Sequence, residues 1–131
     1  MDFSNITVGL KGTATECVVQ DNTAQAMGSG SLPVYATPAM TCLMEKAAAE
    51  LLEKLVPAGW TTVGISLDVK HKAPTPVGPG VRAEAEVTAV EGRKVTFSVH
   101  AFDNQEEIGS GTHERFAVEK EKFLSKASAK R

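Results

Sequence analysis

The sequence predicts an α+β domain built from one long helix and a five-stranded antiparallel sheet. Two observations support this prediction. Helical periodicity is strong in one stretch only, which ends near residue 55. After residue 60 the chain alternates between apolar and polar residues, in segments that are joined by tight turns.

The helical stretch carries a continuous apolar stripe with a spacing of about 3.6 residues per turn. Its members are Met40, Leu43, Met44, Ala47, Ala48, Leu51, Leu52 and Leu55. Thr37 followed by Pro38 is a start signal, because a threonine hydroxyl can cap free amides and proline is tolerated at the first helical position. Pro57 and Gly59 should end the helix.

The strands are expected on both sides of this helix. One precedes it at residues 13–19, and four follow it at 61–73, 81–89, 95–101 and 108–118. In the first of these four, Val63, Ile65, Leu67 and Val69 form the apolar side, on which His71 also falls. Residues 22–27 can make a short helical turn, and the Gly-Ser-Gly-Ser run at 28–31 is a flexible hinge.

These elements predict a single domain over residues 1–131, with a basic tail at 119–131 that can form a short helix at 120–127. Only one helix is available to cover five strands. It should therefore lie across the concave face of a curved sheet, which is the hot-dog fold. One helix cannot cover such a sheet completely, so we expect association through a sheet edge.

Composition argues against several classes of partner. The chain has 14 basic and 16 acidic residues, which gives no bulk attraction to nucleic acid or to a membrane surface. No stretch approaches the roughly 18 apolar residues of a membrane span, and the start lacks the pattern of a leader peptide. We expect a cytoplasmic protein. Cys17 and Cys42 lack metal or redox spacing and predict buried thiols in a reducing compartment.

Three polar residues are candidates for chemistry. Glu45 lies at the margin of the apolar stripe with no basic residue three or four positions away, so we expect an unpaired carboxylate that could act as a base. Thr37 at the helix start and His71 on the following strand should face the same cleft. A hydroxyl, a carboxylate and an imidazole could supply a nucleophile, a base and a proton carrier, and free amides at the helix start could stabilise an oxyanion. Each also has a structural interpretation, as a cap, a surface carboxylate and a core histidine.

The last strand adds Arg115, which could orient an acyl group or an anion or pair with a surface glutamate. His71, His100 and His113 fall on three different strands without metal-ligand spacing, so we expect no metal site.

These residues resemble the fluoroacetyl-coenzyme A thioesterase family of hot-dog proteins. The resemblance covers residues 7–123. It rests on Tyr-Ala-Thr-Pro-Ala-Met-Thr-Cys-Leu-Met-Glu at 35–45, on Gly64, on His71 with the Pro/Gly-rich run after it, on Glu-Gly-Arg-Lys at 91–94 and on Ile-Gly-Ser-Gly-Thr-His-Glu-Arg at 108–115.

The resemblance implies hydrolysis of an acyl-CoA thioester by a homodimer or a tetramer, with no cofactor because CoA is part of the substrate. Thr37 would attack or would position the attacking water, and Glu45 and His71 would transfer protons. Gly64 and Arg115 would hold the acyl or carbonyl end. Gly64 has the opposite strand parity from His71, so any contact it makes should come from its main chain at a bulge.

Two alternatives and one departure accompany this interpretation. A non-catalytic dimer that binds acyl-CoA or an acyl carrier would keep the same pocket, and an enoyl hydratase would need an aspartate and histidine pair that is missing here.

The family's fluoroacetyl enzyme carries bulky phenylalanines before its threonine, where this chain has residues 28–31. Small residues cannot build an apolar gate, so we do not expect fluoroacetyl specificity.

Overall fold

Five strands form one antiparallel sheet in the computed structural model, which describes residues 3–131. Met1 and Asp2, the first two residues of the predicted domain, lie outside the described residues. The strands are β1 (Lys11–Cys17), β2 (Trp60–His71), β3 (Gly80–Glu91), β4 (Lys94–Phe102) and β5 (Glu107–Glu119). Their order in the sheet is β1-β3-β4-β5-β2, so β1 and β2 are the two edges.

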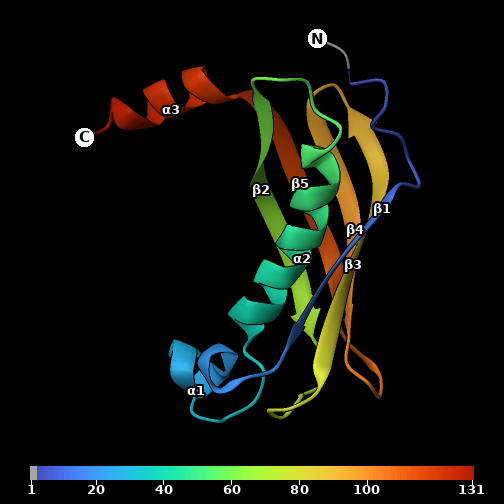
Figure 1. Cartoon of the computed structure of the whole chain (residues 1–131), viewed down its shortest axis with the longest axis vertical. Coiled ribbons are helices and arrows are strands. Elements are labelled where there is room, and N and C mark those ends of the chain that lie inside the picture. Colours follow the sequence, from blue (N-terminus) through green and yellow to red (C-terminus); the bar gives the residue numbers. More distant parts are fainter. Residues whose placement is uncertain (1–2) are drawn as a thin grey trace.

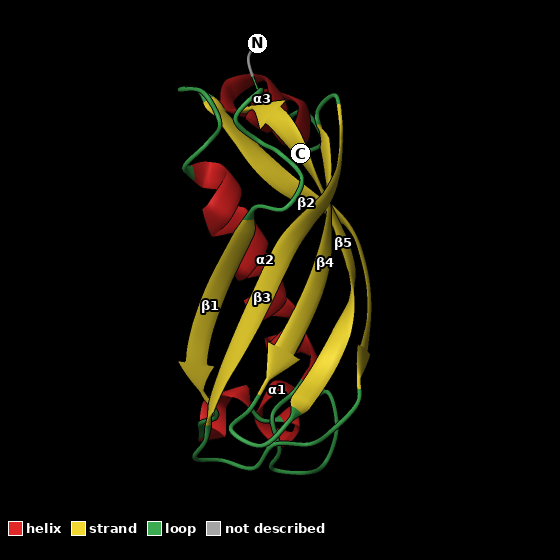
Figure 2. Cartoon of the chain, turned by 90° about the vertical axis from the view of Figure 1, so that its right-hand side faces the viewer, coloured by secondary structure: helices red, strands yellow, loops and turns green. Residues whose placement is uncertain are grey.

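Helix α2 (Thr37–Glu53) runs along one face of the twisted sheet (Figures 1 and 2). The predicted stripe is confirmed, because Met40, Met44, Ala47, Ala48 and Leu52 are fully inaccessible to solvent. They pack on alternating residues of β3 and β4, which include Val87, Phe97 and Val99. This α+β arrangement, with one long helix on a curled five-stranded sheet, is the hot-dog fold that the sequence predicted.

Three short helical segments complete the chain. A 3₁₀ turn η1 (Gln20–Asn22) and α1 (Ala24–Met27) precede the hinge, where Gly28 ends α1 in the left-handed region at φ 74°. Helix α3 (Lys120–Ser128) follows β5 directly and points away from the sheet beyond the β2 edge (Figure 1). None of the helices in residues 3–131 is long and apolar enough to cross a membrane.

Two expectations about burial are wrong. Cys17 and Cys42 are free, but both are exposed, because Cys17 ends the edge strand β1 and Cys42 lies on the outer side of α2. Ile65 and Leu67 are 50% and 36% exposed instead of lying on the buried side of their strand.

For Ile65 the reason is a β-bulge in β2 between Gly64 and Ser66, whereas Leu67 pairs with the buried His113 and is exposed on the edge strand. The extra residue reverses the alternation of the strand. Opposite residues of an antiparallel pair lie on the same face, and Gly64 pairs with Arg115, whereas His71 pairs with Gly109 on the same side of β5. The predicted bulge is therefore present, but Gly64 and His71 share the face toward α2 instead of opposite faces.

Gly111 in β5 should not tolerate a side chain. A Cβ atom there would collide with the Asp68 carbonyl oxygen and would lie 2.6 Å from the Val69 Cα atom. We expect Gly111→Ala to lower the free energy of unfolding by about 3 kcal/mol, because backbone of the edge strand would have to move. Urea denaturation measures this effect, and Gly80→Ala is the control, because its nearest heavy atom would lie at 4.0 Å. Equal stability of the two variants would contradict the prediction.

Candidate functional site

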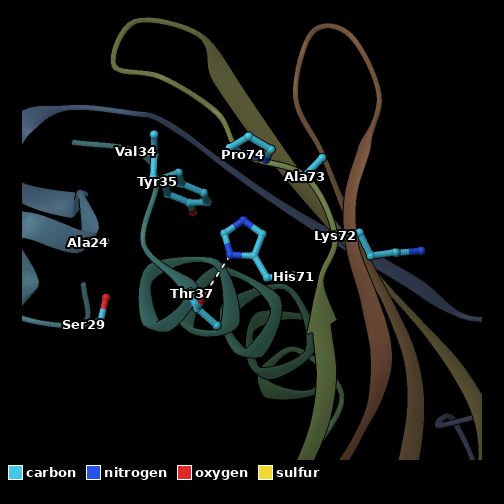
Figure 3. Close-up of a pocket in the computed structure, with 9 residues that line it drawn as sticks. All are labelled: Ala24, Ser29, Val34, Tyr35, Thr37, His71, Lys72, Ala73 and Pro74. Atoms are coloured by element: carbon cyan, nitrogen blue, oxygen red, sulfur yellow. Dashed lines mark hydrogen bonds between the residues drawn. The ribbon is translucent and has the colours of Figure 1, made fainter. Parts of the chain in front are cut away.

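The first cluster of polar residues lies where α2 begins. Thr37 is the first residue of α2, and its Oγ1 atom lies 2.8 Å from Nδ1 of His71, the last residue of β2 (Figure 3). Ala36 is the cap residue of the helix, so the prediction that the Thr37 hydroxyl caps it is wrong. The hydroxyl is instead committed to the imidazole.

One ring nitrogen of His71 makes no hydrogen bond among the described residues. This nitrogen is Nε2, and it is buried. Burial lowers the pKa of His71 because it disfavours the imidazolium, and the backbone of Ala73 opposes this effect only in part. Near neutral pH the ring is therefore uncharged and can accept a proton.

A cavity of about 310 Å³ opens beside this pair. Figure 3 shows Thr37 and His71 pointing toward each other at its wall, with Tyr35 above them. Residues from the hinge region, including Ala24, Ser29 and Val34, line the other side. Tyr35 donates its hydroxyl proton to Glu16, and burial together with this contact raises its pKa, so it stays a neutral phenol.

The start of α2 also has hydrogen-bond donors near Thr37. The first four amides of a helix have no intrahelical acceptor. Pro38 has no N–H group, and the Met40 N–H donates to the Ala36 carbonyl at 3.0 Å. The N–H groups of Thr37 and Ala39 therefore remain at the positive end of the helix dipole, where a developing negative charge is stabilised.

The second cluster lies around Arg115 on β5, next to the edge strand β2. The Arg115 guanidinium is 7% exposed and donates from Nε to the Thr62 hydroxyl at 2.9 Å and from Nη2 to the Thr62 carbonyl at 3.0 Å. Its Nη1 atom lies 3.8 Å from Oε2 of Glu45. The prediction that Glu45 is unpaired is therefore wrong, because a partner from a strand distant in sequence reaches it.

Gly64 completes this cluster. A Cβ atom on Gly64 would lie 2.7 Å from Oε2 of Glu45 and 3.4 Å from Nη1 of Arg115. A side chain at position 64 would displace the Glu45 carboxylate, so glycine lets this carboxylate keep its place beside Arg115. The structure thus brings Glu45, Gly64 and Arg115 together, and separately Thr37 and His71.

His113 belongs to the second cluster and was not identified as a site residue from the sequence. Its Nδ1 donates to the Ser66 carbonyl at 2.8 Å, and its Nε2 accepts from Arg115 Nη1 at 3.3 Å. Burial and the adjacent guanidinium lower its pKa, whereas the Ser66 contact acts in the opposite direction. The sequence did offer one indication of this role. His113 lies two positions before Arg115, and residues with this spacing share one face of a strand.

His113, which is buried, and His71, which is half-buried, predict acid sensitivity. Because their folded pKa values lie below the ordinary 6.5, the unfolded chain binds more protons between those values and pH 6.5. We expect the free energy of unfolding to fall as the pH drops from 7 toward 5. Urea denaturation over this range should show a shallower pH slope for His113→Gln than for the wild type. An identical slope would exclude a contribution from His113.

Comparison with known proteins gives one consistent result. Residues 18–121 match the family model described as fluoroacetyl-CoA-specific thioesterase. A fluoroacetyl-CoA thioesterase from Streptantibioticus cattleyicolor is 41% identical over 97 residues, which cover 74% of this chain and 70% of the relative.

Solved structures agree with this match. The fluoroacetyl-CoA thioesterase FlK superposes with a TM-score of 0.90 at 35% identity, over 96% of this chain and 98% of that chain. A threonine-to-serine mutant of FlK has been solved in complex with acetyl-CoA. A hot-dog-like protein from Thermanaerovibrio acidaminovorans superposes with a TM-score of 0.90 at 26% identity, over 99% and 97% of the two chains.

Proposed function

Because the chain belongs to the fluoroacetyl-CoA-specific thioesterase family, and so is a thioester hydrolase of the hot-dog fold, we propose that it hydrolyses a small acyl-CoA to the free acid and CoA. The observation that carries this proposal is the Thr37 and His71 pair at 2.8 Å beside a cavity of about 310 Å³. An activated hydroxyl next to free helix amides suits attack on a thioester carbonyl.

The chemistry assigned to this pair follows from its hydrogen bond. With Nδ1 of His71 accepting from the Thr37 hydroxyl, the ring proton lies on Nε2. The hydroxyl then either attacks the carbonyl carbon or holds the water that does so, and Nδ1 receives the proton. The oxyanion forms toward the N–H groups of Thr37 and Ala39. The C–S bond breaks, and the CoA thiolate takes up the proton that Nδ1 of His71 received. Where the hydroxyl is the nucleophile, the acyl group is left as an ester on Thr37, and water, with Glu45 as the base, then hydrolyses this ester to the free acid.

The carboxylate requires a second subunit in this proposal. Thr37 and Glu45 are separated by about 12 Å along α2, and Gly64 lies roughly 20 Å from His71 along β2. Glu45 contacts Gly64 and Arg115, so the carboxylate of one chain is remote from the hydroxyl of the same chain. A site that uses all three groups therefore has to draw them from two chains.

We propose a homodimer in which the β2 edges pair antiparallel about a twofold axis. Exposed apolar side chains on this edge, Ile65 and Leu67 at 50% and 36% exposure, support the pairing. The middle of β2 would lie near the axis, so the partner's Glu45 would approach the Thr37 and His71 pair more closely than the chain's own Glu45. Each of the two sites would then combine Thr37 and His71 from one chain with Glu45, Gly64 and Arg115 from the other.

The hinge before α2 indicates which acyl group the site would accept. Ser29 lines the cavity, and residues 28–31 have no bulky side chain that could close an apolar gate. We propose a small acyl group without selection for fluorine. The site of action would be the cytoplasm, which the two free cysteines support.

A thiol-release assay over acetyl-, fluoroacetyl-, branched and aryl-CoA thioesters tests this function. We expect turnover of at least one small acyl-CoA. Fluoroacetyl-CoA has the more electrophilic carbonyl, and its turnover should exceed that of acetyl-CoA only by this difference in reactivity. Tight binding by calorimetry with no thiol release from any substrate would support the non-catalytic alternative and contradict the proposal.

A further inference from the structure

Three basic side chains line a cavity at the end of the molecule opposite the Thr37 pocket. This cavity of about 230 Å³ between the turn after β3 and helix α3 is lined by Arg93, Val118, Glu119, Lys122, Phe123 and Lys126. Lys120 begins the same helix. The Glu-Gly-Arg-Lys turn at 91–94 stood out in the sequence, yet the proposed chemistry uses none of it.

The cations in this cavity differ in how far they are neutralised. Lys122 pairs with Glu119 at 3.3 Å, and Lys94 next to the cavity pairs with Glu91 and Glu114. Within residues 3–131, Arg93 and Lys126 have no carboxylate at ion-pair distance. The Arg93 guanidinium is held over the Trp60 ring at 4.9 Å from its centroid, and Phe3 packs edge-on against the same ring. Arg93 is therefore a positioned cation, and the cavity carries an excess of positive charge.

Helix α3 extends this charge beyond the edge of the sheet. It has no buried residue, and Figure 1 shows it pointing away from the domain past β2. Its base is fixed, because the Lys120 N–H donates to the Gly59 carbonyl at 3.0 Å. A helix of nine residues is marginal alone in water, so it is expected to gain stability from a neighbour beyond β2.

The topology of the proposed dimer determines which part of the partner chain lies next to this cavity. Within one chain the cavity adjoins the Trp60 end of β2, about 36 Å from the His71 end. Antiparallel pairing of two β2 edges sets the Trp60 end of one chain beside the His71 end of its partner. The cationic cavity of each chain is thereby brought next to the mouth of the partner's Thr37 pocket.

We propose that Arg93 and Lys126 bind the phosphate groups of an acyl-CoA whose thioester lies in the partner's site. This inference rests on the proposed function and dimer. The ligand class follows from charge, since the nucleotide end of CoA carries a diphosphate and a further phosphate, and basic side chains suit such groups. The Glu119 carboxylate in the cavity repels anions, but Lys122 neutralises it.

The test compares acyl-CoA with the matching acyl-pantetheine, which has the same thioester and no phosphate. We expect Lys126→Glu to raise KM for acyl-CoA about fivefold, and Arg93→Glu at least as much, with kcat unchanged. KM for acyl-pantetheine should stay at the wild-type value. Lys126→Arg should restore the wild-type KM, and added salt should raise the wild-type KM for acyl-CoA alone.

Lys11→Glu is the matched control, because it makes the same charge change on the opposite sheet edge. An unchanged KM for acyl-CoA in Lys126→Glu and Arg93→Glu would overturn the inference, as would an equal rise for both substrates. These outcomes differ from a failure of the proposed function, in which the wild type itself would release no thiol. Thermal unfolding of each variant separates a lost fold from lost binding.

Discussion

Glu45→Gln is expected to lower kcat for acyl-CoA hydrolysis by about 10² to 10⁴, the range that a positioned acid or base supplies. Glutamine has nearly the same size as glutamate, but it has no charge and does not accept a proton. The fold should survive, because Arg115 keeps both of its hydrogen bonds to Thr62 and because the Glu45 side chain is 42% exposed.

Glu50→Gln is the control for this substitution. Glu50 lies on the same helix and is exposed, so its loss should leave turnover and stability near the wild-type values. Thiol release and urea denaturation are measured for both variants. Unchanged turnover in Glu45→Gln would remove this residue from the mechanism, whereas a loss of activity together with unfolding would assign it a structural role.

Elements defined by repeated local patterns were predictable from the sequence. The helix, its buried stripe and the alternation of β3 and β4 each rest on many residues that indicate the same structure, and the structure follows all three. The pairing of Thr37 with His71 was also within reach, since one residue starts the helix and the other lies on the strand that follows it.

The arrangement around Glu45 was not predictable in the same way. Gly64 indicated a bulge in β2, but the sequence did not show that the extra residue would reverse the alternation and bring Gly64 onto the same face as His71. The pairing of Glu45 with Arg115 joins a helix to the last strand, so it depends on the register of β5 against β2. Spacing along the chain therefore suggested one cleft for all three candidate residues, whereas packing separates them into two clusters.

This separation leads to a complementation experiment with a large expected effect. Thr37→Ala and Glu45→Gln should each be nearly inactive as homodimers. Co-expression of the two chains with different tags, followed by purification through both tags, should yield heterodimers with about half of the wild-type activity, because one of the two sites is complete. The complete site combines Thr37 from the Glu45→Gln chain with Glu45 from the Thr37→Ala chain.

The expected recovery depends on which chain supplies each group. If Thr37 and Glu45 of the same chain acted together, every site in the heterodimer would contain one defect, and no activity would return. Joining both substitutions in one chain and pairing it with a wild-type chain gives the reverse control. Under the composite arrangement each site then lacks one group, so the heterodimer is inactive, whereas under the single-chain arrangement half of the activity remains. The two heterodimers contain the same substitutions in different arrangements, so opposite results between them cannot come from stability or expression.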